Sequence, residues 1–174
     1  MIDEIDRQIL NILQQNARTA NAEIARQVGM APSAVLERIR KLETRGVIRG
    51  YEARIDPEAL GLNLLAFVFV RSDDRSGTST GEVLAGIPEV QEVHHIAGED
   101  CYLAKVRVRD AKTLGRLLRE RFAGSGSVHS TRTTVVLESL RETTLQPISV
   151  EPPASSIAAA VAPIETAEEE EVLS

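Results

Sequence analysis

Aromatic residues and cysteine are scarce in this 174-residue sequence, which has no tryptophan and a single cysteine, Cys101. One cysteine excludes an intrachain disulfide framework and a multi-cysteine zinc site. A core with few aromatic rings has to be built from aliphatic side chains. The shares of hydrophobic residues, 43%, and of charged residues, 26%, are typical of a globular protein.

Long apolar stretches are also missing. None approaches the roughly 20 residues that a membrane-spanning helix needs. The first ten residues, MIDEIDRQIL, are acidic and amphipathic, without the basic start and apolar run of a signal peptide. We therefore expect a cytoplasmic protein with no membrane partner.

The net charge of −6 is distributed unevenly along the chain. Residues 151–174 contain six Glu and no Lys or Arg, so residues 1–150 are neutral overall. Within them, residues 36–54 carry six basic and three acidic side chains. Contacts with phosphates dominate the affinity of proteins for DNA, and they need a locally basic surface rather than a basic protein. The acidic total therefore does not exclude a DNA-binding function.

Residues 3–16 are predicted to form a first helix because their apolar side chains recur at helical spacing. Asp3 offers an N-cap, and Asp6, three residues later, gives a weak version of a capping box. A second, shorter helix is expected over 21–28, where Gly29 ends it in the manner of a left-handed C-terminal cap.

A third helix is predicted from Pro32 to about Arg45, because proline is favoured at the first position of a helix. Only two residues separate Gly29 from Pro32. The segment VIRGYEARID, residues 47–56, has β-branched residues, a glycine and an alternating stretch that suggest a short β-hairpin. Three short helices followed by a hairpin indicate a winged helix-turn-helix.

The second half of the chain alternates strand and helix patterns. Strands are expected over 64–72, 90–97, 101–108 and 127–140, helices over 79–86 and 110–123, and a short edge strand over 143–148. This β-α-β-β-α-β order is that of a ferredoxin-like domain. The predicted fold class is therefore α+β, with a helix-turn-helix domain before the ferredoxin-like domain.

The predicted domains are 1–55 for DNA binding, 56–63 as a linker, and 64–150 as the ferredoxin-like domain. Residues 151–174 are rich in Pro, Ala, Ser and Glu without an aromatic residue, so we expect a disordered acidic tail. The tail is either a solubilising appendage or a competitor of DNA for the basic region.

The third helix is the predicted DNA-reading element, because the second helix of a helix-turn-helix motif lies in the major groove. Arg38 can pair with guanine and Glu37 can accept from cytosine. The charge pattern also fits a merely solvated helix, but the short turn before Pro32 favours DNA binding. The predicted DNA contacts are Ser33, Ala34, Glu37 and Arg38 near base edges, Arg40, Lys41 and Arg45 at phosphates, and Arg49 and Arg54 on the hairpin.

These segments resemble the Lrp/AsnC family of leucine-responsive and asparagine-responsive transcription regulators. The resemblance rests on IDRQIL (5–10), on residues 22–61, and on AFVFV, GEDCYL and STRTTVVLE in the second half, and it covers about 2–148. It implies a protein that binds double-stranded DNA, pairs into homodimers that often assemble into octamers, and responds to a small molecule, commonly an amino acid, held at subunit interfaces.

The resemblance also assigns ligand sensing and oligomerisation to residues 64–150, and it implies which residues bind the effector. They match the family's ligand loop and a Thr-x-Thr on the last strand: Gly98, Glu99, Asp100, Cys101, Tyr102, Thr131 and Thr133. From the residues alone, Gly98 to Asp100 fit an ordinary tight turn, and the threonines fit any strand.

The chain departs from the family pattern at three places. Cys101 stands where many members have an acid, Ala31 stands where a serine usually precedes the proline, and the acidic tail is not a usual feature. Loss of a serine cap costs roughly 1 kcal/mol. The change at Cys101 affects the position expected to meet the ammonium group of an amino acid.

Two other classes of function compete with a ligand-responsive regulator. An enzyme is disfavoured because the sequence has no nucleophile elbow, phosphate loop or metal-ligand cluster. His94 and His95 are adjacent, so in a strand they point to opposite faces and do not form one metal site. A ligand-independent, architectural DNA-binding protein is the stronger alternative, since it would use the same helix-turn-helix and the same oligomer. No cofactor is expected.

Overall fold

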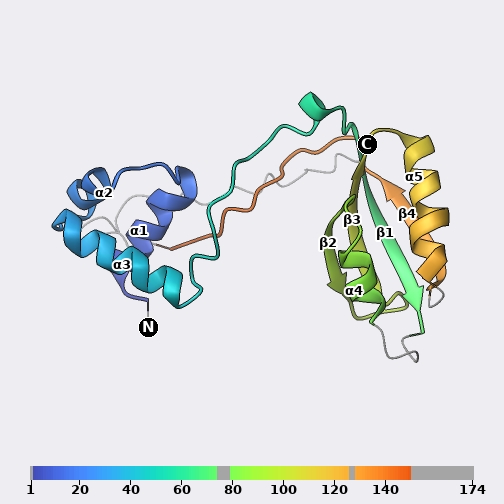
Figure 1. Cartoon of the computed structure of the whole chain (residues 1–174), viewed down its shortest axis with the longest axis horizontal. Helices are drawn as coiled ribbons and strands as arrows, with labels where there is room; N and C mark the ends of the chain where they lie inside the picture. The colour runs from blue at the N-terminus through green and yellow to red at the C-terminus, as the bar shows by residue number, and fades with distance from the viewer. Residues whose placement is uncertain (1, 74–78, 126–127, 150–174) are drawn as a thin grey trace, which may run out of the picture. The chain divides into compact units, whose positions relative to one another are not determined.

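The computed structural model describes residues 2–73, 79–125 and 128–149. The chain divides into two compact units (Figure 1). The described part of the first, the helical unit, is residues 2–52 with 144–149, and the second, the sheet unit, is residues 53–143. Residues 144–149 thus cluster with the first unit rather than with the second domain as expected. The expected disordered tail lies outside the described residues.

The helical unit contains the three expected helices, α1 (Glu4–Gln15), α2 (Asn21–Val28) and α3 (Pro32–Thr44). Asp3 and Asp6 form a complete capping box at the start of α1. Gly29 ends α2 with φ of 69°, a left-handed conformation that favours glycine. The helices pack around an aliphatic core of Ile9, Leu13, Ile24, Ala25, Val35, Ile39 and Leu42.

The expected hairpin over 47–56 does not form, and these residues contain no strand. Val47 and Ile48 instead pack, half-buried, against the core of the helical unit. Both of their backbone N–H groups donate to the carbonyl of Leu42, at 2.9 and 3.2 Å. The β-branched pair thus closes the end of α3 and is not available to a strand. The prediction of a winged motif was wrong for the described chain, which has a helix-turn-helix without a wing.

The sheet unit confirms the expected ferredoxin-like order of elements. Its strands are β1 (Leu64–Ser72), β2 (Val90–His95), β3 (Tyr102–Val108) and β4 (Val128–Val135), and its α-helices are α4 (Thr80–Ala85) and α5 (Ala111–Leu117). The strands form one antiparallel sheet in the order β2-β3-β1-β4. A short 3-10 turn, Glu58–Leu60, precedes β1.

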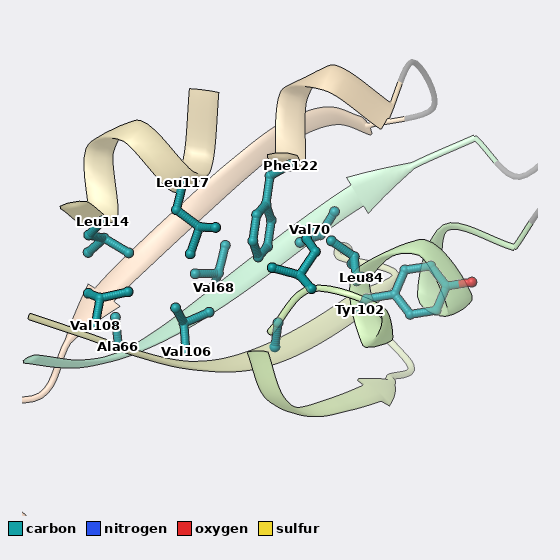
Figure 2. Close-up of a cluster of buried hydrophobic side chains, with 12 residues drawn as sticks. Ala66, Val68, Val70, Leu84, Tyr102, Val106, Val108, Leu114, Leu117 and Phe122 are labelled. Carbon is teal, nitrogen blue, oxygen red and sulfur yellow. The ribbon is translucent and has the colours of Figure 1, made fainter. Parts of the chain in front are cut away.

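The two faces of the sheet differ because side chains alternate along each strand. On one face, residues of β1 and β3 pack against α4 and α5 (Figure 2); these include Val68, Val70, Tyr102, Val106, Leu84, Leu117 and Phe122. Neither helix covers the other face, which we call the open face. Phe67, Phe69 and Leu103 lie there half-buried. The sheet unit thus presents a partly apolar surface that its own helices do not cover.

Two predicted elements end earlier in the structure. β4 stops at Val135, and the N–H of Val136 makes the next bond, to the carbonyl of Leu65 at 2.9 Å. Since β1 begins at Leu64, which the register places opposite residue 137, residues 138–140 have no residue of β1 left to pair with. The helix expected over 110–123 is α-helical only to Leu117 and then widens into a π-helical turn that includes the buried Phe122.

Residues 144–149 form no edge strand, because side chains of α1 bond their backbone. Gln14 donates from Nε2 to the carbonyl of Gln146 and accepts from the N–H of Gln146, both at 3.0 Å. Asn11 and Arg7 donate to the carbonyls of residues 148 and 149 at 3.4 and 3.3 Å. Residues 7, 11 and 14 share one side of a helix, so α1 supplies the partners that a neighbouring strand would have supplied.

Candidate functional site

The exposed side of α3 carries most of the predicted DNA contacts. Ser33 and Glu37 are exposed in its first turns, and Ala34 is half-buried. Arg40, Lys41 and Arg45 are exposed towards its end, where the Nζ of Lys41 lies 3.9 Å from the carboxylate of Glu37. The buried side is Val35, Ile39 and Leu42, as predicted from the spacing.

The start of α3 has no side-chain cap. Ala31 is the N-cap residue and accepts only backbone N–H groups, from Ala34 and Val35. The expected loss of a serine cap is thus confirmed. A helix N-terminus combines free N–H groups with the positive end of the helix dipole, and this combination favours a phosphate oxygen.

Arg38 is tied to the N-terminus of α1 by two charged hydrogen bonds. Its Nη1 atom donates to Asp3 Oδ2 and to Asp6 Oδ1, both at 2.7 Å. Its side chain is 28% exposed, and that of Asp6 is 10% exposed. The capping bond from the backbone of Asp6 and the bond from Arg38 hold the pKa of Asp3 below its usual value, while the two carboxylates raise the pKa of Arg38.

The last two predicted DNA contacts lie outside α3. Arg49 is exposed beyond the end of α3, and Arg54 belongs to the sheet unit. Arg54 donates from Nη2 to the carbonyl of Glu142 at 3.1 Å, which joins the two ends of the sheet unit. Neither residue lies on a hairpin, so the geometry predicted for them was wrong, while their contact with DNA stays a prediction.

The predicted ligand loop connects β2 to β3. The N–H of Cys101 donates to the carbonyl of Val70 at 2.9 Å, and its thiol lies 3.4 Å from the carbonyl of Ser72. Gly98 has φ of 143°, which only glycine adopts readily. The half-buried Cys101 thus fixes one end of the loop on β1, and the glycine allows the loop to turn.

The two acids of the loop have arginine partners on neighbouring strands. Asp100 accepts from Arg132 of β4 at 2.9 Å, and its side chain is 19% exposed. Glu99 is nearly fully exposed; its carbonyl accepts from Arg71 at 3.0 Å, and its carboxylate lies 3.7 Å from the same guanidinium. Asp100 is therefore the acid of the loop that an ion pair fixes in place, and Glu99 is the acid that is accessible to solvent.

The remaining predicted effector residues lie on the face that the helices cover. Thr131 stands opposite Val70, which stands opposite Tyr102, so the three residues form one row across the sheet. Thr133 stands in the next row, opposite Val68. Tyr102 is buried and lies beside the ring of His95, with ring centroids 5.1 Å apart. Thr131 and Tyr102 thus lie on either side of Val70 in the same row, whereas Asp100 pairs with Arg132, whose strand partner is Phe69 of the open face.

Sequence reasoning missed the partners that hold these residues. The Asp3–Asp6 pair was recognised as a cap, but its spacing gives no sign that Arg38, 32 residues after Asp6, would join it. Arg132 stands between Thr131 and Thr133 in the sequence, and nothing in that pattern indicated its bond to Asp100. In the described chain, no group of three or more His, Cys, Asp or Glu side chains is placed to hold a metal ion. Among the same residues, no helix is long and apolar enough to cross a membrane.

Comparison with known protein families gives a match for each half of the chain. An AsnC-type helix-turn-helix domain matches residues 2–43. An Lrp/AsnC ligand binding domain matches residues 65–146. The two matched regions coincide with the three-helix bundle and with the sheet, including the loop that carries Asp100.

Relatives of known function and structure extend over nearly the same residues. The leucine-responsive regulatory protein of Escherichia coli K12 is 38% identical over 145 residues, which is 81% of this chain and 88% of that protein. Escherichia coli AsnC has a TM-score of 0.76 at 31% identity and covers 84% of this chain and 99% of its own. A feast or famine regulatory protein from M. tuberculosis, solved with L-methionine, has a TM-score of 0.79 at 38% identity and covers 86% and 100%. The chain therefore belongs to the Lrp/AsnC family of transcription regulators, with a DNA-binding helix-turn-helix and a ligand-binding domain.

Proposed function

We propose that this regulator binds its DNA site through α3 and changes its DNA binding when an amino acid occupies the loop between β2 and β3. The observation that carries the DNA-binding part is the start of α3. Pro32 begins the helix with only two residues between it and Gly29, the αL cap of α2, and Ser33 and Glu37 are exposed beyond it. This is the geometry in which the second helix of the motif enters the major groove.

The side chains of α3 divide into two groups by position. Ser33, Ala34, Glu37 and Arg38 belong to the first two turns, which meet base edges in this motif. Arg40, Lys41 and Arg45 lie towards the far end and suit phosphate contacts, as do Arg49 and Arg54 beyond the helix. The uncapped N–H groups at Ser33 offer a further phosphate contact.

An amino acid is the effector that the loop best suits. Two solved relatives, from Neisseria meningitidis and M. tuberculosis, were crystallised with L-methionine. Asp100 and Glu99 offer carboxylates for an ammonium group, and Gly98, Cys101, Tyr102, Thr131 and Thr133 complete the proposed site. Because the Cys101 thiol is directed to Ser72, the acid that other family members carry at this position is replaced here by Asp100 or Glu99.

A second copy of the chain is the proposed partner of the open face. Phe67, Phe69 and Leu103 lie there without a covering helix. The sheet unit also exposes Ile55, Leu60, Leu137 and Leu140, with Leu137 99% exposed. A contiguous exposed apolar surface marks an interaction site. We infer a homodimer, with the octamer that the family resemblance implies as a further assembly, acting in the cytoplasm where the DNA is.

The test begins with selection of a binding site from duplexes that have a randomised central segment. The wild-type protein should enrich a two-fold symmetric sequence, as expected for a dimer. Arg40→Ala and Lys41→Ala should each weaken binding to all duplexes and reduce the slope of log affinity against log salt by about 1. Absence of any enriched sequence would contradict the proposed function.

A ligand-independent, architectural DNA-binding protein is the second candidate. The observation that favours it is Cys101, which stands at the family's acid position and is bonded to Ser72. Thermal unfolding in the presence of each of the twenty amino acids separates the two. A ligand at 100 times its dissociation constant adds about 2.7 kcal/mol to stability. A stabilising amino acid supports the sensor, and twenty unchanged melting curves support the architectural protein.

A further inference from the structure

The N-terminus of α1 and the second turn of α3 are joined by one three-residue cluster. Asp3 and Asp6 hold each other in a capping box: the Asp6 N–H donates to Asp3 Oδ1 at 2.8 Å, and the Asp3 N–H donates to Asp6 Oδ2 at 3.3 Å. Each carboxylate thus uses one oxygen to cap the helix. Its other oxygen accepts from Nη1 of Arg38 at 2.7 Å.

This division fixes the guanidinium of Arg38 from one side only. A guanidinium nitrogen of the Nη type carries two hydrogens, and the two carboxylates accept one bond each from Nη1. Within the described residues, Nε and Nη2 of Arg38 have no hydrogen-bond partner. Those two nitrogens form the side edge of the planar fork, an edge that can pair with two acceptors at once.

The cluster is rigid where a surface arginine is usually mobile. An arginine side chain on a helix surface has many rotamers, and ordering it for a contact costs conformational entropy. Here the carboxylates are already fixed by their capping bonds, and Asp6 is buried. The side chain of Arg38 is therefore already ordered before a partner binds. Such preorganisation raises affinity because less conformational entropy is lost on binding.

We propose that Asp3 and Asp6 are positioning residues for DNA recognition: they hold Nη1 of Arg38 so that its Nε–Nη2 edge is presented to a guanine. This inference rests on the proposed function of α3. A guanine offers O6 and N7 as two acceptors in the major groove, which matches the two free donors. The acids touch no base themselves, and they act through Arg38.

The proposal has a signature that a structural ion pair lacks. Removing two negative charges near the DNA surface should leave non-specific binding unchanged or make it tighter, because that binding is electrostatic. The same change should weaken the preference for one base, because Arg38 loses its orientation. Loss of the fold would weaken non-specific binding and base preference together. A loss of base preference without a loss of non-specific affinity therefore identifies a positioning role.

The experiment uses the full chain and the duplex that the wild-type protein selects, with two control duplexes: one with the Arg38-dependent guanine replaced and one unrelated in sequence. The variants are Arg38→Ala and the double variant Asp3→Asn with Asp6→Asn. Asparagine is as good an N-cap as aspartate, so α1 keeps its cap. Asp110→Asn is the matched control, since Asp110 caps α5 through the N–H of Thr113 and has no arginine partner among the residues that the structure describes.

Arg38→Ala should reduce the preference for one guanine by tenfold or more, on the order expected for a lost bidentate contact. The double variant should reduce the preference at the same position on the order of tenfold, with affinity for the unrelated duplex equal or higher. Adding Arg38→Ala to it should change that preference little further, because coupled residues are not additive. Asp110→Asn should change neither quantity.

Three results overturn parts of the account, and they are distinguishable. An unchanged base preference in the double variant, with the preference lost in Arg38→Ala, overturns the positioning role alone. An unchanged preference in Arg38→Ala overturns base reading by Arg38 and the positioning role with it. Failure of the wild-type protein to select any duplex overturns the proposed DNA-binding function itself. Melting curves of each variant, measured beforehand, set a temperature at which all of them are folded.

Discussion

The guanidinium of Arg132 lies over the ring of Phe69 on the open face, with its central carbon 4.0 Å from the ring centroid. The same guanidinium bonds Asp100 of the ligand loop at 2.9 Å. One side chain of β4 therefore joins the proposed effector loop to the surface that we assign to a second copy of the chain. A ligand that displaced Arg132 from Asp100 would also change a contact on that surface.

Arg132→Ala removes both interactions and should lower the free energy of unfolding by about 1 kcal/mol. A cation–π contact of this exposure contributes about 0.5–1 kcal/mol, and an exposed ion pair less than that. Chemical denaturation measures the difference. Arg141→Ala is the control, because Arg141 is exposed and has no partner among the described residues. Equal loss in both variants would contradict the two contacts.

Glu142 neutralises two cations of β3 that are largely buried. It accepts from Arg107 at 2.8 Å and from Lys105, whose side chains are 11% and 13% exposed. Glu142→Gln should cost about 1 kcal/mol in the free energy of unfolding at neutral pH, since it leaves these charges less well paired. Glu138→Gln, at an exposed position, is the control and should change stability by less than about 0.5 kcal/mol.

The contribution of Glu142 should also depend on pH in a defined direction. The hydrogen bond from Lys105 holds the pKa of Glu142 below its usual value of 4.5 in the folded chain. A carboxyl group with a depressed pKa stabilises the fold above its unfolded pKa and loses this effect as the pH falls through its folded pKa. Stability should therefore fall as the pH is lowered below about 4.5, and less steeply in Glu142→Gln. Identical pH profiles would show that the pair does not contribute.

Gly29 determines how α2 leads into α3. Its φ of 69° strains any residue with a Cβ, although no atom lies within 4 Å of the position a Cβ would take. Gly29→Ala should therefore destabilise the helical unit by about 1–2 kcal/mol through backbone strain alone. Gly50→Ala is the matched control, because Gly50 has equal space and no positive φ. Its effect should be close to zero, and a similar loss at Gly50 would contradict the assignment.

Gln14 binds the backbone of residue 146 with both ends of its amide. Gln14→Ala should remove the two bonds of 3.0 Å and accelerate hydrogen exchange at the N–H of Gln146. A typical intramolecular hydrogen bond contributes about 0.5–1.5 kcal/mol, and this site is exposed, so the lower value is expected. Gln15→Ala changes the next, exposed residue of α1 and should leave that exchange rate unchanged. Equal exchange rates at Gln146 in the wild type and both variants would show that residues 144–149 do not bind α1 in solution.

Local signals in the sequence predicted most of the fold. The Asp3 cap, the Gly29 terminator and the Pro32 start each act within a few residues, so they could be read without tertiary information. Short runs of apolar and β-branched residues predicted the four strands, of which β1 and β3 bury side chains on the face towards the helices. The resemblance to Lrp/AsnC regulators identified the family, which the comparisons confirmed.

The errors occurred where distant residues compete for the same backbone or side chain. Val47 and Ile48 have high strand propensity, but they pack against the core of the three helices instead. Residues 143–148 look like an edge strand until Gln14 and Asn11, some 130 residues earlier, bond their carbonyls. The partners of Arg38 are equally distant in sequence, and no periodicity reports them.

The central claim is that DNA binding by α3 responds to an amino acid bound in the sheet unit. The most direct measurement is the affinity of the full chain for its selected duplex, repeated with each of the twenty amino acids in excess. The account predicts that at least one amino acid changes this affinity by about fivefold or more, in the range typical of coupling between two sites. Twenty unchanged affinities for a duplex that the protein does select would contradict it and would leave the ligand-independent DNA-binding protein.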